Sequence, residues 1–181
     1  MKKLNNITNN YYSDEWYTSK EIVSLIIKHF KEFGFDLKGK SVICPFDSEK
    51  SEFVKQLKEY GSFVNYGMND FLEEENYEFE ALLTNPPFSI KDKVIERCIK
   101  SGKKCALILP LDSLGGVSRH ELFKQAEQYP FVMIPNRRIS YTNELGEKKK
   151  GSSMHSIIMF INMGGYSDRI HCRPIEIERG W

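Results

Sequence analysis

The stretch EALLTNPPFSIKDK, residues 80–93, contains the structural unit that decides the class of fold. The apolar run over 79–85 predicts a buried strand, and it must end at Pro86 and Pro87 because proline has no N–H group to donate to a sheet. Apolar residues then recur at helical spacing, at Val94, Ile95, Cys98 and Ile99. A buried strand that leads through a short loop into a helix is the repeating unit of an α/β fold.

The same alternation of strands and helices continues along the chain. Apolar runs predict strands at 41–46, 62–67, 79–85, 104–111 and 131–135. Apolar stripes predict further helices at 17–34, 48–61 and 119–128. Two segments, 137–143 and 152–163, flank the polar tip 144–151 and predict an antiparallel hairpin. The sequence therefore predicts an open α/β sheet, mainly parallel, with an antiparallel C-terminal hairpin and helices on both faces.

Capping signals predict where two of these helices begin. Thr18 is followed three residues later by Glu21, and Ser89 is followed three residues later by Asp92. This is the spacing of a capping box, in which two side chains satisfy the free N–H groups of the first turn. Gly34 is expected to end the first helix.

Length and composition favour a single globular domain. The chain has 181 residues, of which 40% are hydrophobic and 13% aromatic, enough for one sizeable core. We expect a flexible polar arm at 1–13 and one domain at 14–181. The formal net charge is +1, so contact with nucleic acid must come from a local patch. The N-terminus lacks the apolar segment of a signal peptide, and no apolar run is long enough to cross a membrane, so we expect a cytoplasmic protein.

Cysteine and histidine give no indication of a metal site. The four cysteines lack C-x-x-C spacing and are predicted to be reduced thiols: Cys44, Cys98, Cys105 and Cys172. His155 stands between serines, without an acid or cysteine partner, and is expected to be structural or to line a groove. The chain contains no H-E-x-x-H, G-x-S-x-G or Walker-type motif, so nothing supports hydrolase or phosphotransferase chemistry.

The tetrapeptide Asn85-Pro86-Pro87-Phe88 has the groups needed to bind a planar amine. The Asn85 side-chain carbonyl and the Pro86 backbone carbonyl could accept hydrogen bonds from the two N–H groups of a nucleobase amine, which would free its delocalised lone pair. The prolines fix the backbone and add no competing donors, and Phe88 offers a flat face for a base taken out of its stack. The alternative interpretation is a Pro-Pro turn with Phe88 in the core.

LLTNPPFS resembles the catalytic motif of the S-adenosylmethionine-dependent N6-adenine DNA methyltransferases, particularly the small phage-type enzymes. This resemblance implies a Rossmann-like methyltransferase sheet, S-adenosylmethionine as cofactor, and a catalytic role for Asn85 to Phe88. EWYTSKEIV resembles the opening motif of that family, which implies cofactor contacts from Trp16, Tyr17 and Thr18. MNDFLE resembles the motif that contacts the cofactor's adenine, which implies the same role for Asp70 and Phe71.

The chain departs from this family where the cofactor is expected to bind. No glycine follows the first strand, and Pro45, Phe46 and Asp47 occupy the turn instead, as candidate cofactor-binding residues. Asp47 could bond an amino group or hydroxyl of the cofactor, or it could be a structural turn or N-cap residue. The acid expected after the second strand is also absent, and Asn65 is the nearest polar candidate. A methyltransferase-like protein that binds nucleic acid or protein without catalysis therefore remains an alternative.

Nucleic-acid contacts are expected from basic residues near the motif and near the hairpin. The candidates are Lys91, Lys93, Arg137, Arg138, Lys148, Lys149 and Lys150. DNA is the expected partner, with methylation of adenine N6 as the expected reaction. RNA and the glutamine side chain of a protein are alternative acceptors, because both present a planar NH₂ group.

Overall fold

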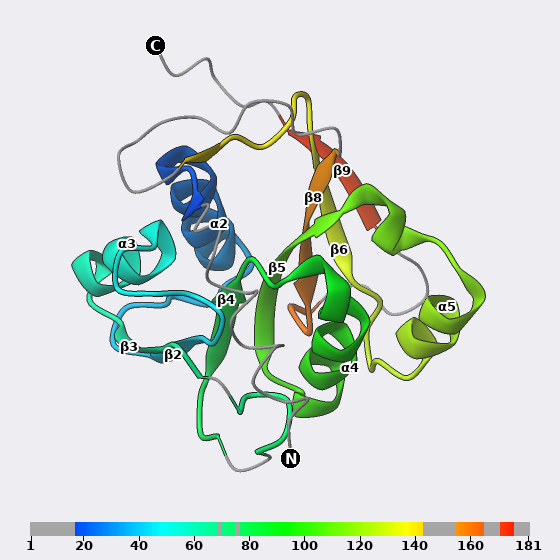
Figure 1. The fold of residues 1–181 in the computed structure, drawn as a ribbon, viewed down its shortest axis with the longest axis horizontal. Coiled ribbons are helices and arrows are strands. Elements are labelled where there is room, and N and C mark those ends of the chain that lie inside the picture. The colour runs from blue at the N-terminus through cyan, green and yellow to red at the C-terminus, as the bar shows by residue number, and fades with distance from the viewer. Residues whose placement is uncertain (1–16, 69, 75–76, 143–154, 165–170, 176–181) are drawn as a thin grey trace, which may run out of the picture.

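The computed structural model describes residues 17–68, 70–74, 77–142, 155–164 and 171–175 of the chain. The predicted arm at 1–13 lies outside these residues, as does the polar tip of the predicted hairpin. Three layers make up the described part, with a central sheet covered by helices on both faces (Figure 1).

The central sheet has seven strands in the order β3-β2-β4-β5-β8-β6-β9. Their bounds are Phe63–Tyr66 for β3, Ser41–Cys44 for β2, Ala81–Thr84 for β4, Lys104–Pro110 for β5, Ser156–Ile161 for β8, Phe131–Pro135 for β6 and His171–Ile175 for β9. The first four strands in this order are parallel, β8 is antiparallel to both of its neighbours, and β9 is parallel to β6. This confirms the prediction of a mainly parallel sheet with an antiparallel unit near the C-terminus.

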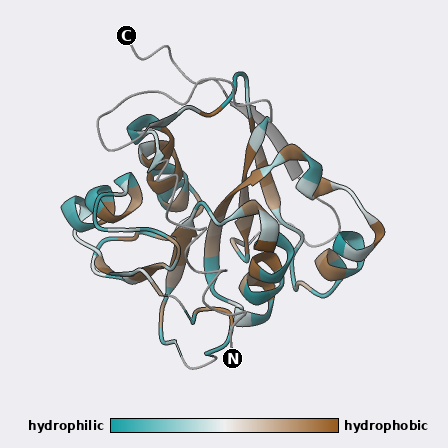
Figure 2. Cartoon of the chain, in the orientation of Figure 1, coloured by the Kyte–Doolittle hydropathy of each residue, from teal (hydrophilic) through white to brown (hydrophobic). Residues whose placement is uncertain are grey.

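Two helices cover each face of the sheet, as predicted. Helices α2 (Lys20–Glu32) and α3 (Glu52–Tyr60) pack against one face, while α4 (Lys91–Ser101) and α5 (Val117–Lys124) lie on the other. Side chains along β5 alternate between the two cores, because successive residues of a strand point to opposite faces. In Figure 2 the central strands are coloured brown and the helices carry teal on one side, as expected of a buried sheet with amphipathic covers.

The two predicted capping boxes are wrong. Thr18 belongs to the short strand β1 (Tyr17–Thr18), and Ser19 is the N-cap of α2, without a side-chain capping bond. Helix α4 follows a 3-10 turn at Phe88–Ile90, and no side chain caps it. Thr18 does not cap the helix, because it pairs instead with a strand more than a hundred positions away in the sequence. The predicted stop at Gly34 is confirmed, since its φ of 80° ends the helix in the left-handed region.

The antiparallel unit differs from the prediction in its first arm. Strand β8 pairs with β5 and β6, whereas the segment predicted as its hairpin partner contributes β7 (Tyr141–Thr142), which pairs with β1. Ile139 and Tyr141 are buried, so the apolar pattern in 137–143 correctly predicted a buried segment. It did not specify the strand with which this segment pairs. Strand β9 was not predicted, and its Pro174 is tolerated because β9 lies at the edge of the sheet.

None of the helices within the described ranges has both the length and the apolar character needed to span a membrane. Cys44, Cys98 and Cys105 are buried in the two cores and form no disulfide within the described residues.

Candidate active site

The candidate site lies where the parallel strands end. The carboxyl ends of β2, β3, β4 and β5 share one edge of the sheet, and ligands of open α/β sheets bind outside this edge. The NPPF tetrapeptide begins directly after Thr84, the last residue of β4. The structure therefore places the motif at the edge of the sheet where ligands of this fold class bind.

The four residues of the motif are packed differently from one another. Pro86 is buried, whereas Asn85, Pro87 and Phe88 each keep part of their surface exposed. The Phe88 ring belongs to neither of the two hydrophobic cores, although it begins the 3-10 turn that leads into α4. An aromatic face at the sheet edge, outside the core, is available to stack on a ligand.

Three buried polar side-chain atoms in the described part of the chain have no hydrogen-bond partner: Thr18 Oγ1, Asn85 Oδ1 and Ser113 Oγ. Such atoms are rare in folded proteins, because leaving a buried polar atom unpaired costs about 1–3 kcal/mol. Ser113 lies in the 3-10 turn Leu111–Leu114. This turn directly follows β5, the strand that neighbours β4 in the sheet. Sequence reasoning missed Ser113, because no motif surrounds it.

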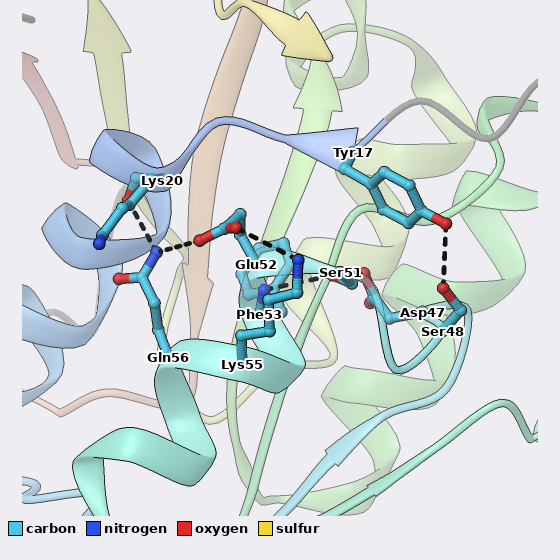
Figure 3. A network of polar contacts seen from close by, with 9 residues as sticks. All are labelled: Tyr17, Lys20, Asp47, Ser48, Ser51, Glu52, Phe53, Lys55 and Gln56. Carbon is cyan, nitrogen blue, oxygen red and sulfur yellow. Dashed lines mark hydrogen bonds and ion pairs between the residues drawn. The ribbon is translucent and has the colours of Figure 1, made fainter. Parts of the chain in front are cut away.

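The turn after β2 is organised by Asp47 in place of glycines. Its Oδ1 accepts a 2.7 Å hydrogen bond from Ser51 Oγ, and its Oδ2 accepts one of 2.7 Å from Thr84 Oγ1. Ser51 also caps α3 by accepting the Phe53 N–H at 3.2 Å (Figure 3). Loss of hydration raises the pKa of Asp47 to about 6, against the lowering effect of the two hydroxyl hydrogen bonds.

The other two residues of this turn join it to the loop after β3. The Pro45 carbonyl oxygen accepts a 2.8 Å hydrogen bond from the Met68 N–H. The Phe46 ring meets the Phe71 ring edge-to-face, with centroids 5.7 Å apart. Phe71 is only 1% exposed, so the half-buried Phe46 presents more ring surface to a ligand than Phe71 does.

Of the remaining predicted cofactor residues, Tyr17 lies beside this turn. The hydroxyl groups of Tyr17 and Ser48 are 3.1 Å apart, which brings β1 next to the turn after β2 (Figure 3). The exposed Asp70 accepts a hydrogen bond from the Tyr77 hydroxyl, and this bond raises the pKa of Tyr77 to about 12. Asn65 is exposed in the middle of β3. Trp16 lies outside the described residues.

The predicted nucleic-acid contacts that fall within the described residues lie after the carboxyl ends of β4 and β6. Lys93, Arg137 and Arg138 are exposed, and Lys91 Nζ donates a 3.4 Å hydrogen bond to the Phe88 carbonyl oxygen. Lys148, Lys149 and Lys150 lie outside the described residues. His155 Nε2 donates to the Pro135 carbonyl oxygen at 2.8 Å, a contact that joins the start of β8 to the end of β6.

The sheet order, in which β8 runs antiparallel between β5 and β6, gives this chain a Rossmann-like fold similar to that of a solved methyltransferase structure. This similar structure is a chain from Listeria monocytogenes assigned to the class I S-adenosylmethionine-dependent methyltransferases, with 9% identity and a TM-score of 0.52 over 88% of this chain and 65% of that one. A dimethyladenosine transferase from Plasmodium falciparum has 15% identity and a TM-score of 0.48 over 80% of this chain and 62% of that one.

This chain therefore spans less than two thirds of the length of either structure. A predicted O-methyltransferase from Agrobacterium tumefaciens has 9% identity and a TM-score of 0.43, over 78% of this chain and 80% of that one. No protein-family model matches the sequence, and no curated protein gives a match. At 9% identity and a TM-score of 0.52, the similarity to the Listeria structure shows the fold alone.

Proposed function

We propose that this protein transfers a methyl group from S-adenosylmethionine to the exocyclic N6 of adenine in DNA. The observation that carries the proposal is the Asn85 side-chain oxygen, which is buried and unpaired at the carboxyl end of β4. An acceptor that has lost its water and has no partner within the protein is suited to receive an N–H group from a ligand.

The motif contributes positioning and hydrogen bonding to the reaction. Asn85 Oδ1 accepts one N–H of the amine and the Pro86 carbonyl accepts the other, which increases the electron density available at the nitrogen. Phe88 stacks on the extruded base, with a contribution of about 1–3 kcal/mol for such contacts. Holding the amine in line with the methyl donor accounts for most of the expected rate.

The residues at the sheet edge fit S-adenosylmethionine, which supplies an electrophilic methyl group when bound. The unpaired hydroxyl groups of Thr18 and Ser113 are free to bond its polar groups, and Phe46 offers an aromatic surface for its adenine. Tyr17 and Asp70 are further candidates from the loops that border the edge. The turn after β2 lacks glycine, so we assign binding to these side chains rather than to a close approach of the backbone.

DNA is the proposed acceptor, and exposed basic side chains at the same edge of the sheet as the motif support a nucleic acid. Lys93 lies on α4 just after the motif and Arg137 follows β6, and both can contact phosphate groups. RNA and protein glutamine present the same planar amine, and the choice among the three acceptors is an outcome of the test.

The test measures cofactor binding first and methyl transfer second. Calorimetric titration with S-adenosylmethionine and S-adenosylhomocysteine is followed by transfer of a labelled methyl group to DNA, RNA and protein. We expect saturable binding, and transfer to DNA with N6-methyladenine as product. Absence of binding at millimolar cofactor, with or without DNA, would favour the non-catalytic alternative.

Substitution of Asn85 tests the assignment of the motif. Asn85→Ala is expected to lower kcat by about 10²–10³-fold, the usual cost of removing one preorganised hydrogen-bonding group, while cofactor affinity and fold are retained. Gln125→Ala removes an exposed amide at the end of α5 and serves as the control. Retained activity in Asn85→Ala would refute the role of this residue.

A further inference from the structure

The end of β4 is held on one side by a side chain rather than by the sheet. Pairing between β2 and β4 stops at Ile43 and Leu82, two residues before Thr84. On that side Thr84 Oγ1 donates a 2.7 Å hydrogen bond to Asp47 Oδ2, while on the other side Thr84 pairs with Leu107 of β5. Thr84 is fully buried and directly precedes Asn85, so this bond fixes the point from which the motif starts.

The motif itself has few means of anchoring its own backbone. Pro86 and Pro87 have no N–H group, so neither can donate to a neighbouring strand. The Pro87 carbonyl oxygen accepts from the Ile90 N–H at 3.1 Å, which holds the far end of the loop. Asn85 Oδ1 has no partner within the described residues. The orientation of the Asn85 side chain therefore depends on how firmly Thr84 is held.

Asp47 is in turn fixed to the start of α3. Ser51, which is 1% exposed, donates to the second carboxylate oxygen of Asp47 and caps the helix through the Phe53 N–H (Figure 3). Both oxygens are thus occupied by hydroxyl donors from two different elements. A carboxylate with both oxygens engaged is a rigid bridge, and replacement of either partner leaves one oxygen without its donor.

We propose that Asp47 is a positioning residue for methyl transfer, which aims the Asn85 amide oxygen at the target amine by holding Thr84. This inference rests on the function proposed above. The turn after β2 would then position the motif rather than approach the cofactor, because the Asp47 carboxylate binds Thr84 at the end of β4. This bridge requires a carboxylate side chain at position 47, so glycine cannot occupy that position.

Kinetic measurements on three variants test this role. Thr84→Val keeps the shape of the side chain and removes the hydroxyl group, and it is expected to lower kcat by about 10–100-fold with the cofactor Kd unchanged within about threefold. Thr84→Ser restores the hydroxyl group and is expected to recover most of kcat. Ser62→Ala is the matched control. It removes the buried 2.8 Å hydrogen bond from the Ser62 hydroxyl group to the Leu37 carbonyl oxygen, just before the amino end of β3 and away from the edge that carries the motif.

These outcomes separate positioning from general loss of structure. A kcat in Thr84→Val within about twofold of the wild-type value would overturn the proposal, as would an equal loss in Ser62→Ala. Failure of Thr84→Ser to recover activity would also overturn it. Asp47→Asn provides a second variant if Thr84→Val does not fold. It is also expected to lower kcat while the cofactor Kd stays unchanged.

A measurement independent of activity distinguishes failure of this inference from failure of the proposed function. The side-chain NH₂ resonances of Asn85, assigned by their loss in Asn85→Ala, are expected to shift in Thr84→Val and Asp47→Asn, and to return in Thr84→Ser. They are expected to stay in place in Ser62→Ala. Should the wild-type protein transfer no methyl group, unchanged Asn85 resonances in Thr84→Val would still refute the coupling, and shifted resonances would support it.

Discussion

The Asp47 carboxylate predicts a specific dependence of stability on pH. Its pKa is raised from 3.8 to about 6 in the folded protein, because burial disfavours the charged form. The folded state therefore binds a proton more tightly than the unfolded state at this site. The contribution of Asp47 to the free energy of unfolding is fully present below about pH 4 and is lost as pH rises through about 6.

The size of this effect follows from the shift. A change from 3.8 to about 6 corresponds to about 3 kcal/mol over the whole range, at 1.36 kcal/mol for each pKa unit. About 2 kcal/mol of this falls between pH 4.5 and 7.5. Other acids act in the opposite direction: hydrogen bonds lower the pKa values of Asp36, Glu80 and Glu121. The wild-type curve alone therefore does not isolate Asp47.

A comparison with Asp47→Asn removes these other contributions. The variant keeps the shape of the side chain but cannot ionise, so the difference in unfolding free energy, variant minus wild type, is expected to rise by about 2 kcal/mol from pH 4.5 to 7.5. Urea denaturation followed by circular dichroism at four pH values in this range measures the difference. Glu49→Gln is the control, because it makes the same change from carboxylate to amide at a side chain that is 77% exposed.

Two outcomes would refute this reasoning. A difference that stays constant with pH would mean that Asp47 has an ordinary pKa in the folded protein. A difference that falls as pH rises would mean that the hydroxyl hydrogen bonds outweigh the loss of hydration.

Two further predictions concern the rest of the fold. Asn162 has a φ of 59°, and its side-chain NH₂ donates to two backbone carbonyl oxygens at 3.0 and 2.9 Å. Asn162→Ala is therefore expected to lower the free energy of unfolding, measured by urea denaturation, by about 2–3 kcal/mol. If backbone strain contributes, Asn162→Gly should lower it by less. Cys44, Cys98 and Cys105 are buried, so at most one of the four thiols should react with a thiol reagent until denaturant is added; two or more fast-reacting thiols would contradict this packing.

Much of the fold could be predicted from the sequence, because the determining signals are local. The prolines at 86 and 87 mark the end of a strand wherever they occur in a sheet, and the apolar run at 104–111 is typical of a strand buried on both faces. The position of the NPPF motif follows from these two signals together with the alternation of strands and helices.

The features that the sequence did not reveal depend on long-range pairing. Asp47 and Thr84 are 37 positions apart, and their contact requires the relative register of β2 and β4. Ile139 and Tyr141 marked a buried segment without specifying β1 as its partner. Ser113 became a candidate only when its hydroxyl group was seen to be buried without a partner.

The position of β8 between β5 and β6 has a consequence for synthesis of the protein on the ribosome. Within the described residues, β6 pairs only with β8 and β9, and both follow it in the sequence. While the chain emerges, β6 has no strand to join, and one edge of β5 stays open until residues 156–161 have left the exit tunnel. Exposed strand edges pair readily with other chains. The half of the sheet beyond β5 is therefore completed late, and its unpaired strand edges are open to other chains during that interval.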